Sequence, residues 1–373
     1  MRCDAVIIGG GLAGAATAIS AARAGLQATV LEREAIPKHK VCGEFLSVST
    51  IEALRALGVC PLQLGAVPLD RVRVSAGGAP VEAILPFRAV SLSRKTLDAA
   101  MLDAAAEAGA VVRRGVRVRD AGQAPPTAAR AGRWHIDASC GALNTDRLVI
   151  ATGKTDLRGH ARPSGVHGAM VGLKRLVVPA RTPEPVIDLA LFPGGYAGIQ
   201  PIEDGRLNVC LAVTRAHVRR HGVDGAFASA ACAAPHLSAT LGALAGETHA
   251  TANIPYGMVR KAHPSRPHYV GDQAAVIASI LGEGMAIALT TGADLGAQLA
   301  DPDKARAALR KATAAARHRV RLSGVLSHLA CSGPGAATLM SAARLQPGLV
   351  RLAASLSRLP PHTRETGIDA PHR

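Results

Sequence analysis

Three glycines and one acid near the start of the chain have the spacing of a phosphate-binding turn. Gly9, Gly11 and Gly14 follow a short apolar run, and Glu32 closes the next apolar run. Gly9 permits a tight turn, Gly11 lets the backbone approach a pyrophosphate, and Gly14 allows close packing of the following helix. The start of that helix offers free N–H groups to phosphates, and Glu32 is placed to accept ribose hydroxyls. This spacing predicts a dinucleotide site.

Cys42 is a candidate for chemistry rather than binding. It follows Lys40 in a loop, and we expect Cys42-Gly43-Glu44 to open a helix that runs to about Leu57. A cationic neighbour and a helix N-terminus both favour a thiolate. The alternative interpretation is a small packing residue in a loop that lies on a ligand, and the sequence favours neither.

Two glycine turns far along the chain can reach the other end of a nucleotide. Asp272, next to Gly271, can accept hydrogen bonds from ribose or ribityl hydroxyls. Gly282-Glu283-Gly284 precedes a helix expected from Met285 to Leu299, whose first N–H groups can hold a developing negative charge. Ala151-Thr152-Gly153, after an apolar strand, lets the backbone pass close to a nucleotide.

The elements that must position these residues divide into two kinds. The opening strand–helix–strand unit, an Ala-rich helix from about Ser93 to Ala108 and a returning strand at 268–270 are typical of a parallel α/β domain. The tail from Asp301 is expected to be helical and basic, and frayed at its end. A turn is expected around Pro125-Pro126.

The middle of the chain is β-rich without intervening helices. Residues from about 165 to 255 predict a separate antiparallel sheet with a helix at roughly 224–244, and residues 60–90 predict an antiparallel excursion. A sheet inserted into a nucleotide domain usually forms one wall of a substrate cavity. For Phe192 and Tyr196, ordinary sheet packing is the more frequent role.

Composition limits the classes of function. The 373 residues are 48% hydrophobic and carry a net charge of +16. The seven cysteines are scattered without a metal-ligand pattern, and neither a secretory signal nor a membrane span is expected, which favours a reducing cytoplasm. Aromatic residues make up only 2%, so nucleic acid is not an expected partner. The excess positive charge is explained equally well by a solvated face or by peripheral contact with anionic lipid.

Taken together, six motifs resemble the two-domain FAD oxidoreductases that include geranylgeranyl reductases and aromatic-ring monooxygenases. They are GGGLAG (9–14) with Glu32, KVCGEFLS (40–47), SRKTLD (93–98), ATG (151–153), FPGGYAGIQP (192–201) and GDQAAVIASILGEGMAIAL (271–289). The resemblance implies a glutathione-reductase-type Rossmann domain, an inserted antiparallel substrate sheet and a helical tail. Its expected boundaries are 1–60, 90–160 and 262–310 for the FAD domain, 61–89 and 161–261 for the substrate domain, and 311–373 for the tail.

The resemblance also implies roles for particular residues. FAD would be held by the residues of these motifs: Gly9, Gly11, Leu12, Ala13, Gly14, Glu32, Arg33, Cys42, Gly43, Arg94, Ala151, Thr152, Gly153, Gly271, Asp272, Gly282, Gly284 and Met285. Cys42 and Tyr196 are the candidate catalytic residues. Two departures concern Gln273, where the family often has Ala, and Ser279, where it usually has proline. The acidic-Gly motif of many ring hydroxylases is replaced by residues 154–159.

Two activities are open for this scaffold. We favour a monooxygenase that hydroxylates a lipophilic or aromatic substrate with O2 through a flavin C4a-hydroperoxide. The alternative is a reductase of isoprenoid carbon–carbon double bonds, with Cys42 or Tyr196 as the acid. No second GxGxxG is present, so a stable NAD(P)H domain is not expected. The electron donor is expected to be transiently bound NAD(P)H or another protein. An electron-transfer partner protein and a redox-inactive FAD protein are less favoured.

Overall fold

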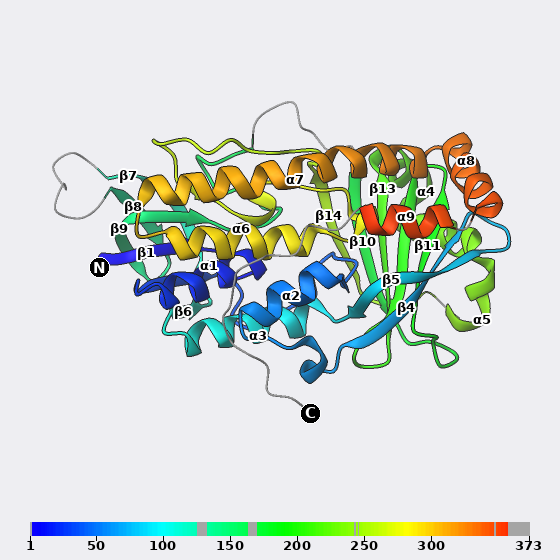
Figure 1. The fold of residues 1–373 in the computed structure, drawn as a ribbon, viewed down its shortest axis with the longest axis horizontal. Coiled ribbons are helices and arrows are strands. Elements are labelled where there is room, and N and C mark those ends of the chain that lie inside the picture. Colours follow the sequence, from blue (N-terminus) through cyan, green and yellow to red (C-terminus); the bar gives the residue numbers. More distant parts are fainter. Residues whose placement is uncertain are drawn as a thin grey trace.

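The computed structural model describes residues 2–124, 133–162, 170–241, 244, 246–346 and 348–356. They form two β-sheets with helices packed on and between them (Figure 1). The predicted fold class, a Rossmann-like α/β domain with a second sheet and a helical C-terminal region, is confirmed. The turn expected at Pro125-Pro126 and the frayed end of the tail lie outside the described residues.

The first sheet has seven strands and carries the predicted nucleotide turn at the end of β1. Across the sheet the order is β6 (Val111–Arg114), β2 (Ala28–Glu32), β1 (Arg2–Ile8), β9 (Gly141–Ile150), β8 (Trp134–Ala138) and β7 (Val118–Gln123), while β15 (His268–Tyr269) also pairs with β9. β6, β2, β1, β9 and β15 pair in parallel. Their carboxyl ends therefore meet at one edge, which is where open α/β sheets bind ligands.

Close helix packing holds that edge in place. α1 (Leu12–Arg23) packs against α6 (Gly284–Gln298) and α3 (Arg94–Glu107). Two glycines of α6 allow the approach, since a Cβ on Gly292 or Gly296 would lie 2.3 or 2.4 Å from a carbonyl oxygen of α1. A side chain at either position would separate the two helices. The first turn of α1 is therefore supported by α6, which begins on the other side of the site.

The second sheet has eight strands. Their order is β14 (Thr248–Ile254), β10 (Met170–Val177), β13 (Leu207–Thr214), β12 (Gly195–Pro201), β11 (Val186–Phe192), β4 (Val67–Ser75), β5 (Val81–Ser91) and β3 (Phe45–Leu46). The described pairings are antiparallel except between β4 and β11, which run parallel. α4 (Arg215–Ala233) packs on one face. Residues of the other face look toward the first domain and the C-terminal helices.

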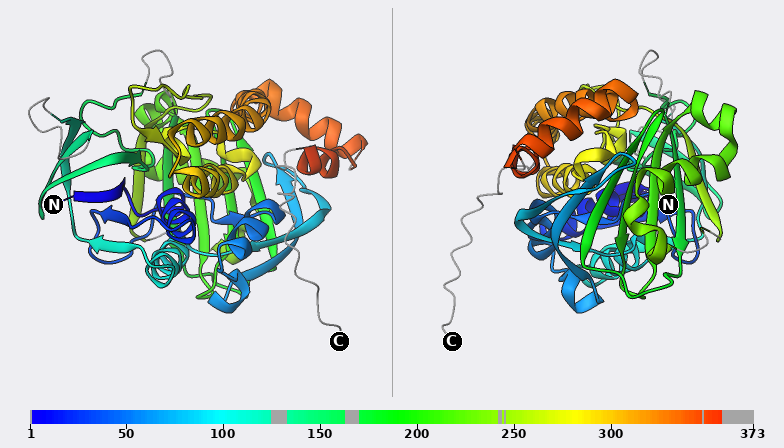
Figure 2. Two further views of the ribbon diagram at one scale, coloured as in Figure 1. Left: turned by 60° about the vertical axis from the view of Figure 1, so that its left-hand side comes forward. Right: turned by 90° about the vertical axis from the view of Figure 1, so that its right-hand side faces the viewer.

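The C-terminal helices join the two sheets. α7 (Pro302–Cys331) packs on α6 and continues to β11 and β12, so it spans the molecule lengthwise (Figure 1). α8 (Gly333–Leu345) begins where Ser332 accepts a hydrogen bond from the Gly335 N–H. α9 (Gly348–Leu356) lies against β5, at the end of the molecule that faces the viewer in the right-hand view of Figure 2. Among the described helices, none is both long and apolar enough to cross a bilayer.

Two expected helices begin elsewhere. α2 spans Val48–Ala56 because Ser47 caps it, and residues 45–46 instead form β3. Cys42 therefore precedes a strand, so the helix-terminus argument for its thiolate was wrong. α4 starts at residue 215, where Thr214 caps it, and ends ahead of Pro235 rather than running over 224–244.

Candidate functional site

A cavity of about 840 Å³ lies between the ligand-binding edge of the first sheet and one face of the second. All the residues predicted from the sequence to bind the cofactor or act in catalysis line it, except Gly14. Residues brought together there are as far apart in the chain as Ile8 and Ala354. Its size is that of a cofactor and ligand site.

The three glycines of the first turn serve different purposes. A Cβ on Gly14 would lie 1.9 Å from the carbonyl oxygen of Gly9, so Gly14 lets α1 pack on the turn itself. Gly9 has a φ of +105°, and a Cβ there would lie 2.5 Å from the Ala151 oxygen. A Cβ on Gly11 would meet only the side-chain ends of Arg94 and Lys40, at 3.6 and 3.9 Å. The space above Gly11 is therefore open for a phosphate.

Glu32 lies at the end of β2 and faces this turn. Its Oε2 accepts a hydrogen bond from the Gly10 N–H at 2.6 Å, and its Oε1 accepts one from the Glu34 N–H at 2.9 Å. Each carboxylate oxygen has a second lone pair, so both can also accept ribose hydroxyls. The backbone thus orients Glu32 for the predicted role.

Three cations converge on the same region. Lys40 Nζ and Arg94 Nε contact Asp98 at 2.6 and 2.8 Å. Lys154 Nζ lies 3.1 Å from Asp272 Oδ2, and the charge of Asp272 raises the pKa of Lys154. The three cations outnumber by one the two carboxylates that pair with them, Asp98 and Asp272. A pyrophosphate would complement that excess, so the residues present fit FAD. Sequence reasoning gave no cofactor contact to Lys40, although it opens the KVCGEFLS motif, and it missed Lys154, which follows the Ala151-Thr152-Gly153 turn.

The turn containing Cys42 and Gly43 is fixed by the second sheet. Asn208 Nδ2 donates to the Cys42 and Gly43 oxygens at 3.1 and 2.8 Å, and Gln200 Nε2 donates to the Gly43 oxygen at 2.8 Å. Glu44, at a φ of +59°, pairs with Lys174 of β10, and both side chains are fully buried. Burial raises the pKa of Glu44. Cys42 consequently stands in the cavity wall at a position set by β10, β12 and β13.

Two tyrosines meet at the ring end of the cavity. The hydroxyls of Tyr196 and Tyr256 lie 3.0 and 2.9 Å from Ser279 Oγ. Burial raises the pKa of Tyr196 and raises that of Tyr256 to about 12, so both hydroxyls are protonated at neutral pH. Gly282, with a φ of +70°, and the start of α6 lie just beyond Ser279. Tyr256 carries no motif and was missed. Phe192 packs under α4 and does not line the cavity.

The far half of the cavity is aliphatic. Its walls come from β4, β5 and β11 and from helices α7, α8 and α9. The side chains are Val72, Val74, Leu85, Ile187, Leu189, Leu191, Leu326, Leu339, Leu349 and Val350. Such a surface takes an apolar chain and offers no ion pair to a charged substrate.

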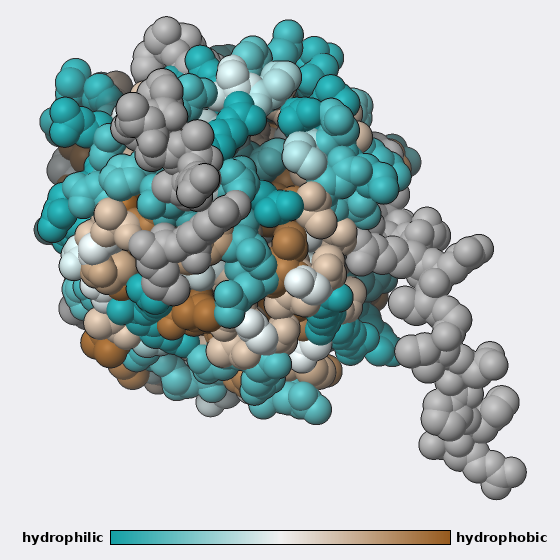
Figure 3. Space-filling model, turned by 90° about the vertical axis from the view of Figure 1, so that its left-hand side faces the viewer, coloured by the Kyte–Doolittle hydropathy of each residue, from teal (hydrophilic) through white to brown (hydrophobic). Residues whose placement is uncertain are grey.

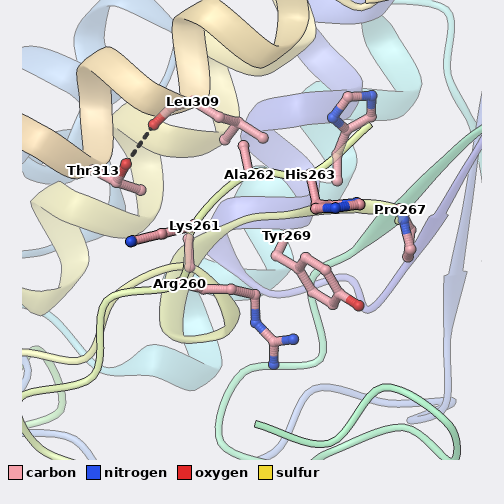
Figure 4. Close-up of a pocket in the computed structure, with 10 residues that line it drawn as sticks. Arg260, Lys261, Ala262, His263, Pro267, Tyr269, Leu309 and Thr313 are labelled. Carbon is pink, nitrogen blue, oxygen red and sulfur yellow. Dashed lines mark hydrogen bonds between the residues drawn. The ribbon is translucent and has the colours of Figure 1, made fainter. Parts of the chain in front are cut away.

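A second pocket, of about 10 Å³, has room for about one water molecule. Its residues connect to the main cavity through Gln273. There Arg260 stacks 3.9 Å over the Tyr269 ring (Figure 4) and its Nε donates to the Gln273 oxygen at 3.1 Å. The Gln273 amide donates in turn to the Gly153 oxygen at 2.9 Å. Gln273 therefore ties the 151–153 turn to Asp272, which explains one departure from the family pattern.

Comparison with known proteins agrees with this geometry. Residues 2–133 match the family model of the FAD binding domain. A menaquinone reductase of Mycolicibacterium smegmatis is 28% identical over 316 residues, 78% of this chain and 75% of that protein.

Solved structures share the fold. The flavin-dependent brominase Bmp2 superposes with a TM-score of 0.72 and 17% identity, over 95% of this chain and 94% of that one. A geranylgeranyl bacteriochlorophyll reductase-like protein of Thermoplasma acidophilum gives 0.66 and 17%, over 95% and 99% of the two chains. Since a brominase and a reductase-like protein share this fold, the fold does not identify the reaction.

Proposed function

We propose that this chain is an FAD-dependent oxidoreductase that reduces a carbon–carbon double bond in a lipophilic substrate of the isoprenoid class. The match of residues 2–133 to the family model of the FAD binding domain supports the cofactor. The observation that carries the proposal is the aliphatic half of the cavity, which opens onto paired tyrosine hydroxyls at the ring end. The Mycolicibacterium relative is named for menaquinone, a quinone with a polyprenyl chain, and this supports the same substrate class.

The apolar walls bind and orient the chain. An extended aliphatic substrate gains free energy from burial along β4, β11 and α9, at roughly 25 cal/mol per Å² of apolar surface removed from water. The same walls exclude water from the reacting double bond. A substrate with a charged group would lose its hydration there without an ionic partner.

The cofactor end is held by the glycine turn, Glu32 and the cations Lys40, Arg94 and Lys154. Bound FAD, once reduced, supplies one hydrogen with its electron pair. We infer that NAD(P)H or a protein donor reduces it. Uncapped N–H groups at Gly284 and Met285 start α6 beside the cavity, where they stabilise negative charge on the bound ring.

The second hydrogen arrives as a proton, and the tyrosine pair is placed to deliver it. Tyr196 or Tyr256 donates its hydroxyl proton toward the cavity, Ser279, within 3.0 Å of both, passes a proton between them, and solvent replaces the proton that the pair has lost. Cys42 also lines the cavity and is the second candidate for this donor.

The hydroxylation favoured from the sequence is the second candidate function. It is supported by the apolar walls of the cavity, which would also protect an oxygenation reaction from water.

Product analysis separates the two. The full-length protein, loaded with FAD, is incubated with menaquinone and NADPH with and without O2, and the product mass is measured. We expect a gain of two hydrogens on the prenyl chain, with or without O2. Gain of an oxygen atom, only when O2 is present, would replace reduction by hydroxylation.

The tyrosine pair is tested in the same assay. We expect Tyr256→Phe and Tyr196→Phe each to lower kcat by about 10²-fold while FAD stays bound. Unchanged kcat in both, with a loss in Cys42→Ser, would assign the proton to Cys42.

A further inference from the structure

Beyond Asp303 in the first turn of α7, the C-terminal helices carry charge of one sign. From Lys304 to Leu356 the chain has nine Lys and Arg residues and no Asp or Glu. Seven of the nine are exposed: Lys304, Arg310, Lys311, Arg317 and Arg321 on α7, Arg344 on α8, and Arg351 on α9. Such a surface attracts an anionic partner over about a Debye length.

Large apolar side chains are exposed among these charges. Leu345, at the end of α8, is 88% exposed, and Leu352 on α9 is 52% exposed. Neither lines the cavity, so both face away from the protein. α9 is strongly amphipathic: its Val350 packs on β4 and β5, and Arg351 and Leu352 lie on the outside.

The same two helices form the outer wall of the cavity. Leu339 and Ala342 of α8 and Val350 and Ala354 of α9 face the aliphatic half. The exposed surface that carries Leu345 and Leu352 is therefore separated from the substrate cavity only by the thickness of α8 and α9. It lies at the opposite end of the molecule from the N-terminus (Figure 1). Figure 3 views the N-terminal end, where polar side chains surround a smaller apolar area.

We propose that α8 and α9 dock this protein on a membrane surface containing anionic lipid, which rests on the proposed lipophilic substrate. Leu345 and Leu352 enter the boundary between headgroups and acyl chains, while Arg344 and Arg351 contact lipid phosphates. A lipid substrate then reaches the cavity past α9 without crossing water.

Lipid is the occupant that fits both features. An amphipathic helix with leucines outside and arginines beside them is suited to the headgroup boundary. An acidic protein partner would complement the arginines. It would not explain why the exposed leucines lie on the same helices that form the wall of the aliphatic cavity. The charge and the cavity together favour the bilayer.

Vesicle sedimentation tests the proposal without turnover. The FAD-loaded full-length protein is mixed with phosphatidylcholine vesicles with or without about a third phosphatidylglycerol. We expect binding to the anionic vesicles only, falling steeply as salt is raised. Leu345→Asp with Leu352→Asp should weaken that binding by at least about tenfold. Leu62→Asp, 51% exposed on another surface, is the matched control and should bind like the wild type.

Failure of this proposal is distinguishable from failure of the proposed reaction. Wild-type binding that ignores lipid charge, a double variant that binds like the wild type, or an equal loss in the control would each overturn the docking surface. Turnover of a short, water-dispersed prenyl substrate is measured in parallel. It reports on the reaction alone and should be unchanged in the double variant.

Discussion

The glycines of the first turn differ in what a side chain at each would disturb. At Gly14 an added Cβ meets the Gly9 oxygen at 1.9 Å, whereas at Gly11 it meets only movable side-chain ends. Gly11→Val should therefore fold with a wild-type thermal transition but retain no FAD, because the valine occupies the space of the phosphates. Gly14→Ala should instead lose fold stability.

Bound flavin absorbance and apo-protein thermal unfolding check this pair. Full FAD occupancy in Gly11→Val would contradict the assignment of the pyrophosphate to this turn.

Gly198 is a candidate determinant of substrate size. It lies on β12 in the cavity floor, between Leu189 of β11 and Cys210 of β13, and an added Cβ would meet nothing within 4 Å. Glycine inside a strand is unfavourable unless something approaches closely. We expect Gly198→Leu to keep FAD and raise KM for the lipophilic substrate by about tenfold or more. Gly122→Leu, equally open but on β7, is the control, and a parallel change there would refute the prediction.

At the scale of elements, one buried ion pair joins the Cys42 turn to β10. Lys174→Met removes the partner of Glu44 and should cost roughly 3–5 kcal/mol, because a buried carboxylate is left uncompensated. Lys174→Met with Glu44→Gln should recover most of that loss. Urea unfolding of the three proteins is the measurement, and a single variant as stable as the wild type would show that the pair is dispensable.

β15 carries a pH-sensitive residue. Burial lowers the pKa of His268 to about 4, so the folded protein favours its neutral form. The contribution of His268 to stability is then fully present above its unfolded pKa near 6.5 and is lost as pH falls toward 4. His268→Gln should unfold with a shallower dependence on pH over that window. Identical slopes for variant and wild type would contradict this assignment.

For the whole molecule, the cofactor half could be predicted from sequence and the substrate half could not. The glycines, Glu32 and Asp272 perform backbone and charge functions that demand particular residue types at fixed spacing, so they form recognisable motifs. Tyr256 needs only a hydroxyl group, and the cavity walls from α8 and α9 need only apolar side chains. Their positions are set by tertiary packing and not by spacing in the sequence. No local pattern marks them.

Local capping explains the misplaced helices. Ser47 and Thr214 start α2 and α4, and the apolar pattern alone did not distinguish them from nearby positions. The departures from the family pattern at Gln273 and Ser279 could be explained only from the structure. Gln273 links the 151–153 turn to the turn at Asp272, and Ser279 contacts the hydroxyls of both tyrosines.

The central claim is that the cavity brings reduced FAD and an isoprenoid double bond together. A single anaerobic turnover tests it directly: the FAD-loaded protein is reduced, freed of excess reductant and mixed with menaquinone. Because the quinone ring can itself take electrons, the readout is hydrogen gained by the prenyl chain. We predict about one saturated double bond per flavin reoxidised, and much slower formation in Tyr256→Phe. Flavin that reoxidises while the chain stays unsaturated, or only after O2 is admitted, would contradict the claim.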